Sequence, residues 1–178
     1  MMTPKNKTAA HELAGNAQEA GFTLIELLIV MSIMLILMSL AVPQILKLTK
    51  TANETSALQS VRTIGQAELQ YHSAYPQNGF ACSISQLGGA PGSGAPTAQA
   101  SQLLDPGLAS GNKSGYTFAI TNCSKVTINN QDMITSYQIT AVPQSVGKTG
   151  DAGYCSDENN IIKKDPAGGT NCTVSLGQ

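Results

Sequence analysis

Glu26 is the first residue of this sequence that demands a chemical explanation. It is the one charged residue between Phe22 and Val42, and the nearest basic residue downstream is Lys47. A carboxylate in a purely apolar surrounding is costly, by about 2.5–3.5 kcal/mol on membrane-insertion scales. We therefore expect Glu26 to have a functional role and a positively charged partner from outside this stretch.

The stretch around Glu26 is long enough to cross a membrane. As an α-helix, the segment from Phe22 to Val42 would extend over about 30 Å, which matches the apolar thickness of a bilayer. Pro43 follows directly and lacks the N–H group that a helix would use, so it predicts a kink or a loosening of the helix there.

The residues just before the apolar stretch form a recognisable pattern. Gly21 and Phe22 are followed without a gap by Thr23, Leu24, Ile25 and Glu26. This run resembles the start of bacterial type IV pilins and of the pseudopilins of type II secretion. In that family a glycine marks the cleavage point, and Phe-Thr-Leu-Ile-Glu opens a long apolar helix.

The resemblance implies how the chain is processed and assembled. A prepilin peptidase would cleave between Gly21 and Phe22 and methylate the new amino group of Phe22. During assembly this group would pair with Glu26 of a neighbouring subunit. Positions four apart also face each other on one helix, so a pair within the chain stays open. The resemblance further implies insertion in the bacterial inner membrane, an assembly platform there, and a filament built with other pilin-like subunits.

Two alternatives explain the apolar stretch without a filament. An ordinary secretory signal peptide would use Ser39 and Ala41 as the small residues before a cut at Val42. Its apolar part is usually shorter, and its positive charges lie next to it, whereas Lys5 and Lys7 lie far upstream here. A plain membrane anchor accounts for the length but not for Gly21-Phe22 or Glu26.

Together with the residue pattern, the resemblance implies that the whole chain is an exported α+β protein with a type IV pilin-like fold. We expect a leader at residues 1–21, a transmembrane and assembly helix at 22–43, its amphipathic continuation at 44–76, and a globular head at 77–178. The continuation carries an apolar stripe that should pack under a small antiparallel sheet. Pro76 and Gly79 should end the helix. The stripe consists of Ala57, Val61, Ile64, Tyr71 and Tyr75.

Alternating residues predict the strands of the head. After a long connection at 77–115, most flexible at 88–94, a strand is expected at 116–121 with a weak continuation to 128. A turn at 129–132 leads to a second strand at 134–142, closed by Pro143, and these two strands should pair antiparallel. A short hairpin at 152–156 and 159–163 precedes a loop at 165–170.

Four cysteines lie beyond the apolar stretch: Cys82, Cys123, Cys155 and Cys172. They form no Cys-x-x-Cys pair, and an even number in an exported domain predicts two disulfides without fixing the pairing. Pilins often close a C-terminal loop with a disulfide, and this resemblance favours Cys155–Cys172, which leaves Cys82–Cys123.

The sequence indicates no enzyme and no cofactor. His72 is the only histidine after the leader, and no Ser, Asp or Cys lies at a spacing that would build a nucleophile and a base. With 12% charged residues and a net charge of −1, the composition indicates no specific nucleic-acid partner.

Calcium is a weaker possibility near the C-terminus. Oxygen ligands in loops suit this ion, and the major pseudopilins bind it in this region. The spacing here matches no calcium loop, and an acidic hairpin tip is usually just solvated. The candidate ligands are Asp151, Asp157, Glu158 and Asp165.

The favoured interpretation is a subunit of a type IV pilus that serves adhesion, motility or DNA uptake. The disulfides and the glycine-rich loop favour a displayed pilus. The acidic C-terminal loop favours a type II secretion pseudopilin in a periplasmic pseudopilus. A membrane-anchored binding module is the third alternative, and filament formation separates it from the other two.

Overall fold

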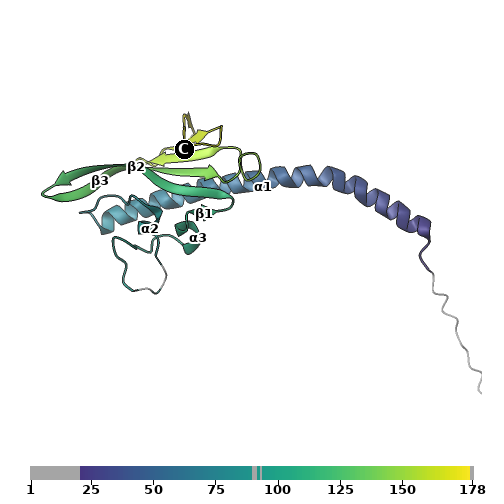
Figure 1. Cartoon of the computed structure of the whole chain (residues 1–178), viewed down its shortest axis with the longest axis horizontal. Helices are drawn as coiled ribbons and strands as arrows, with labels where there is room; N and C mark the ends of the chain where they lie inside the picture. The colour runs from purple at the N-terminus through teal and green to yellow at the C-terminus, as the bar shows by residue number, and fades with distance from the viewer. Residues whose placement is uncertain (1–20, 90–91, 93, 177–178) are drawn as a thin grey trace, which may run out of the picture. The chain divides into compact units, whose positions relative to one another are not determined.

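The computed structural model describes residues 21–89, 92 and 94–176. Figure 1 shows the long helix α1 beside a sheet and short helices. The helices are α1 (Leu24–Ala74), α2 (Ile84–Leu87) and α3 (Pro106–Ala109). The strands are β1 (Asn112–Lys113), β2 (Tyr116–Ile128), β3 (Gln131–Pro143), β4 (Gly153–Asp157), β5 (Ile162–Asp165) and β6 (Val174–Ser175).

Helix α1 belongs to two compact units, one ending at Ala41 and one beginning at Val42. The helix is continuous through Pro43, so the residues on both sides of this proline are helical. The kink expected at Pro43 stays a prediction. The expected leader, residues 1–21, lies outside the described residues except for Gly21.

The six strands form one antiparallel sheet in the order β1-β2-β3-β4-β5-β6. The long strands β2 and β3 pair as expected, with Ile120 opposite Ile139. A bulge interrupts their register between Thr121 and Lys125, and Asn122 has a φ of 52° there. With α1 packed against this sheet, the α+β fold expected from the sequence is confirmed.

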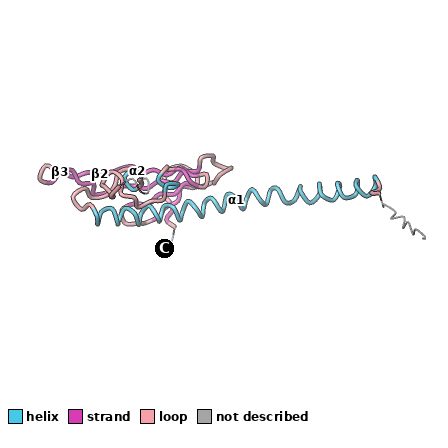
Figure 2. The backbone as a smooth tube through the Cα atoms, turned by 90° about the horizontal axis from the view of Figure 1, so that it is seen from below, coloured by secondary structure: helices cyan, strands magenta, loops and turns pink. Residues whose placement is uncertain are grey.

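The core lies between the sheet and the part of α1 that follows Val42. Figure 2 shows the strands running along this part of the helix. The expected stripe is buried at Ala57, Val61, Ile64 and Tyr71, whereas Tyr75 is half-buried. Each large apolar side chain buried here contributes roughly 1.5–3 kcal/mol of transfer free energy. Opposite the stripe, the sheet and short helices supply Tyr116, Phe118, Tyr137, Ile139, Tyr154, Leu87 and Leu108.

Several boundaries differ from the sequence expectations. The turn expected at 129–132 was too long: Asn129 and Asn130 alone adopt positive φ, and β3 already begins at Gln131. Two adjacent left-handed residues are what a tight hairpin turn requires. The connection expected at 77–115 contains α2, α3 and β1. The hairpin expected at 152–156 and 159–163 starts and ends slightly later, and Asp165 ends β5 instead of opening the loop.

Two disulfides join the head internally. Cys82 is bonded to Cys123 and Cys155 to Cys172, with a Cα–Cα distance of 6.0 Å in each pair. The pairing is the one that the sequence analysis favoured. The first bond connects the segment after α1 to the bulge of β2, and the second connects β4 to the chain just before β6.

Candidate processing and assembly site

Residues Thr23 and Glu26 form the structured start of α1. The helix begins at Leu24, and the backbone N–H and the hydroxyl of Thr23 both donate to Glu26 Oε2, at 2.9 and 2.7 Å. In return, the backbone N–H of Glu26 donates to Thr23 Oγ1 at 3.3 Å. This reciprocal arrangement is a capping box, which satisfies N–H groups that have no partner within a helix.

The capping box was missed in the sequence analysis, although its signal is present. Thr-x-x-Glu before an apolar run is the sequence pattern of such a cap. In the sequence analysis, only the charge of Glu26 and its need for a positively charged partner were considered. In the structure one of its oxygens already accepts two hydrogen bonds, so a partner from another chain would add to or replace these bonds.

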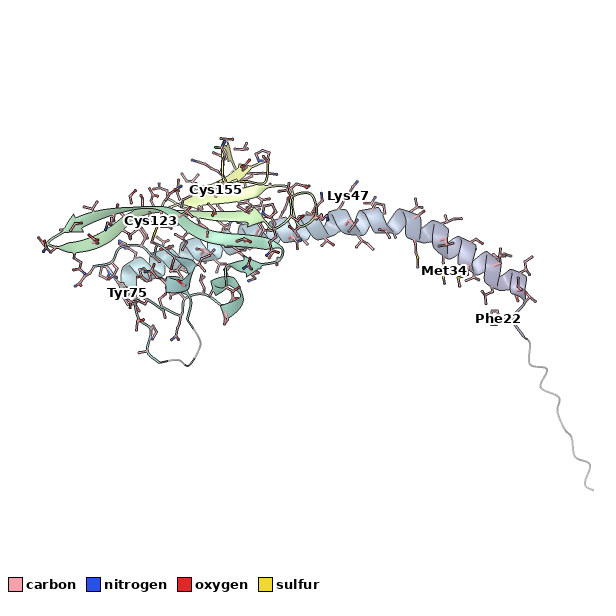
Figure 3. All side chains as sticks on the ribbon, viewed as in Figure 1. Phe22, Met34, Lys47, Tyr75, Cys123 and Cys155 are labelled. Carbon is pink, nitrogen blue, oxygen red and sulfur yellow. A yellow bond between two sulfur atoms is a disulfide. The ribbon has the colours of Figure 1, made fainter. Side chains whose placement is uncertain are left out.

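Gly21 and Phe22 precede the helix and are open to their surroundings. Phe22 is 86% exposed, and a Cβ atom added to Gly21 would meet no atom within 4 Å. Figure 3 shows Phe22 at the beginning of the helix. The structure therefore gives no packing reason for a glycine at position 21. A requirement for glycine there would have to come from a partner that handles the peptide bond.

The part of α1 that follows is apolar around its whole circumference. All residues from Leu24 to Ala41 are exposed, and the helix has a mean hydropathy of 2.7 over its most apolar window. Its hydroxyls are satisfied within the helix: Ser32 donates to the Leu28 carbonyl at 2.5 Å and Ser39 to that of Ile36 at 2.7 Å. By length and composition this helix can cross a membrane.

The family comparison decides what this segment is. Residues 16–42 match the family model of the prokaryotic N-terminal methylation motif. The chain carries the signature of type IV pilins and pseudopilins. No curated protein and no solved structure was found to match it. The matched residues include Gly21, Phe22 and Glu26 and extend over the apolar stretch, so the signature covers the residues for which the sequence analysis expected a role in processing or assembly.

Three of the four candidate calcium ligands, Asp151, Asp157 and Asp165, have separate partners in the structure. Asp151 pairs with Lys50, at 2.9 Å between carboxylate oxygen and Nζ. Asp157 Oδ1 accepts the N–H groups of Asn159 and Ile161 in the β4–β5 turn, where Glu158 also lies.

Asp165 completes the set and is buried. Its oxygens accept the N–H groups of Ala167 and Asn171, at 2.9 and 3.0 Å, which fixes the loop after β5. Among the described residues, no group of three or more His, Cys, Asp or Glu is placed to hold a metal ion. We therefore do not propose a calcium site.

His72 lies on the exposed side of α1, near its end. Its ring is stacked on that of Phe80, with 4.8 Å between the ring centroids. None of the hydrogen bonds found between described residues involves its side chain. This position fits the surface or core-edge role expected from the sequence better than a role in acid–base chemistry.

Proposed function

We propose that this chain is a structural subunit of a type IV pilus-like filament and not an enzyme. It would be inserted in the inner membrane, cleaved after Gly21 and methylated on Phe22 by a prepilin peptidase, and then polymerised. The observation that carries this proposal is the prepilin signature at the start of a helix that is apolar on every side. Such a helix needs lipid before assembly and other helices afterwards.

The capping geometry supports a specific role for Glu26 in assembly. Oε2 accepts both bonds from Thr23, and hydrogen bonds to Oε1 are absent among the described residues. The carboxylate can therefore keep its cap and receive the charged amino group of another subunit's Phe22. Leaving lipid would exchange one apolar contact for another, while the ion pair would form only in the filament.

Glu26→Gln tests the charge without removing the cap, because Gln also serves at this position of a capping box. We expect cleavage to stay near the wild-type level and filament yield to fall at least about tenfold, because each subunit contact would lose its ion pair. Immunoblots of cell-bound and filament fractions measure both. Glu54→Gln, on the same helix but outside the signature, is the matched control. Normal filament yield in Glu26→Gln would contradict the role.

Gly21→Leu tests the cleavage site. A bulky side chain next to the scissile bond should prevent processing, while the open surroundings of Gly21 leave the fold unaffected. We expect full-length chain to accumulate with both disulfides formed, as read by intact mass under non-reducing conditions. Mature-length chain in this variant would count against cleavage after Gly21.

The location of the mature chain separates the candidate filaments. N-methyl-Phe22 at the start of chains in sheared surface material indicates a type IV pilus that serves adhesion, motility or DNA uptake. The same start confined to the cell envelope indicates a type II secretion pseudopilin. An uncleaved chain without filaments indicates a membrane-anchored binding module, and a chain starting at Val42 indicates an ordinary signal peptide.

A further inference from the structure

Glu68 is a buried carboxyl group that the filament function does not use. It lies on α1 and is 0% exposed. Its Oε2 accepts the backbone N–H of Ala81 at 2.8 Å, whereas Oε1 has no hydrogen-bond partner among the described residues. The hydroxyl of Tyr137 on β3, 2% exposed, is also without a partner. A fully buried carboxylate without a counter-ion is strongly disfavoured.

No positive charge in the described head compensates Glu68. The ion pairs between described residues join Lys50 to Asp151, Lys113 to Asp105 and Lys125 to Asp132, and none includes Glu68. The groups that titrate around it are phenols and acids: Tyr71 on α1, Tyr137 on β3, and Asp157 and Glu158 beyond Tyr137 in the β4–β5 turn. His72, the basic group in the last turn of the same helix, is exposed and packs against the ring of Phe80.

The segment that covers Glu68 is a short strap, residues 78–82, between the end of α1 and α2. The strap is bonded to β3 on its other side, because Phe80 N–H donates to the Ile134 carbonyl at 3.0 Å and Ile134 N–H to the Asn78 carbonyl at 2.9 Å. The ring of Phe80 lies 4.9 Å from that of Tyr137. At its end, Cys82 is tied to Cys123 of β2. The strap thus connects α1 to both long strands.

We propose that Glu68 is protonated in the folded head and acts as a pH-dependent latch, whose ionisation opens the strap. Ionisation requires water around the carboxylate, and the strap is the loop segment bonded directly to it. Two backbone hydrogen bonds to Ile134 and the Cys82–Cys123 disulfide hold the strap to the sheet. Opening a loop costs less free energy than opening a sheet. Burial raises the pKa of Glu68 to about 8, which places this change at mildly alkaline pH.

The latch is independent of the proposed filament function, since all its groups belong to the unit that begins at Val42. Its consequence is a local one. At pH 6 the strap should be closed and hold the outer half of the β2–β3 hairpin through Ile134. At pH 9 the strap should open more often, with the Cys82–Cys123 bond limiting how far it moves.

Two measurements on the full mature chain in detergent micelles test the latch. A carbon-detected NMR titration of the Glu68 carboxyl should give a midpoint well above its ordinary 4.5. Amide hydrogen exchange, corrected for the intrinsic rate, should show the protection of Phe80 and Ala81 falling at least about tenfold between pH 6 and pH 8.5. The titration needs no variant, so it remains informative whatever substitutions do to folding.

Glu68→Gln should remove the pH dependence of strap protection. The amide oxygen of Gln can accept the Ala81 N–H, and the amide group does not ionise. Glu54→Gln is the matched control: Glu54 also lies on α1 and accepts a backbone N–H, that of Asp151 at 2.8 Å. Strap protection in this control should still fall with pH. A Glu68 midpoint near 4.5, or equal protection of the strap in wild type and Glu68→Gln at pH 8.5, overturns the proposal.

Discussion

The residues at the start of α1 show that one side chain can serve the fold and the function together. Glu26 accepts both the N–H and the hydroxyl of Thr23, so the negative charge is held against the positive end of the helix. This position lowers the cost of the charge before assembly. It also fixes the carboxylate at the very beginning of the helix, where an incoming amino group would approach.

Thr23→Val removes the hydroxyl from this cap and keeps its shape. We expect the first turn of α1 to lose about 1 kcal/mol, as for other cap substitutions. The amides of Glu26 and Leu27, which donate to Thr23, should then exchange roughly fivefold faster in detergent-solubilised chain. Thr49→Val is the control, because the Thr49 hydroxyl only returns a bond to the Ile45 carbonyl within the helix. Unchanged exchange in Thr23→Val would show that the capping box does not stabilise the helix.

At the scale of the elements, the hairpin of β2 and β3 requires a turn with two left-handed residues. Asn129 and Asn130 have φ values of 52° and 63°, where L-residues other than Asn and Gly are strained. Asn130→Gly should therefore keep or raise the free energy of unfolding, and Asn130→Val should lower it by about 1–2 kcal/mol. Denaturant unfolding measures both. Asn159→Val, in a turn but without positive φ, should have little effect; an equal loss there would exclude the turn as the cause.

Elements that are determined by residues close in sequence could be predicted, whereas elements that depend on distant segments could not. The long helix, its buried stripe and the pairing of β2 with β3 follow from periodicity, which the sequence displays directly. The bulge at Asn122 and the short helix α2 do not, since they are set by contacts with distant segments. One such contact is the bond from Cys82 to Cys123. The burial of Glu68 was hidden for the same reason, because its neighbours Ala81 and Tyr137 come from other elements. Helix α3 has a local signal that the sequence analysis did not use, because the side chain of Asp105 caps it and Pro106 begins it.

At the scale of the whole molecule, the chain requires two environments. In the unit that ends at Ala41, the described helical residues are all exposed and almost all apolar, so this unit has no core of its own. The unit that begins at Val42 has a buried apolar core and is held by two disulfides. We therefore expect membrane and filament contacts to stabilise the first unit. The stability of the second unit should depend on pH and on redox conditions.

The stability of the head should fall as the pH rises from about 5 to 9. Glu68 has a pKa of about 8 when folded and an ordinary value of 4.5 when unfolded. Between these two values the folded state binds more protons than the unfolded state. The contribution of Glu68 to the free energy of unfolding is therefore largest below pH 4.5 and decreases until the pH passes about 8. The expected loss is roughly 2–5 kcal/mol. Asp105, whose pKa is lowered by the Leu108 N–H, acts with the opposite sign at more acidic pH.

Buried phenols set the alkaline limit of the pH range in which the effect of Glu68 can be measured alone. Burial raises the pKa of Tyr154 to about 12. Denaturant unfolding of the full chain in detergent, at intervals from pH 5 to 9, measures the effect of Glu68 before these phenols ionise. Glu68→Gln should give a nearly flat profile that lies above wild type at pH 9, and Glu54→Gln should keep the wild-type slope. A wild-type profile as flat as that of Glu68→Gln would mean that the folded head carries Glu68 in its ionised form.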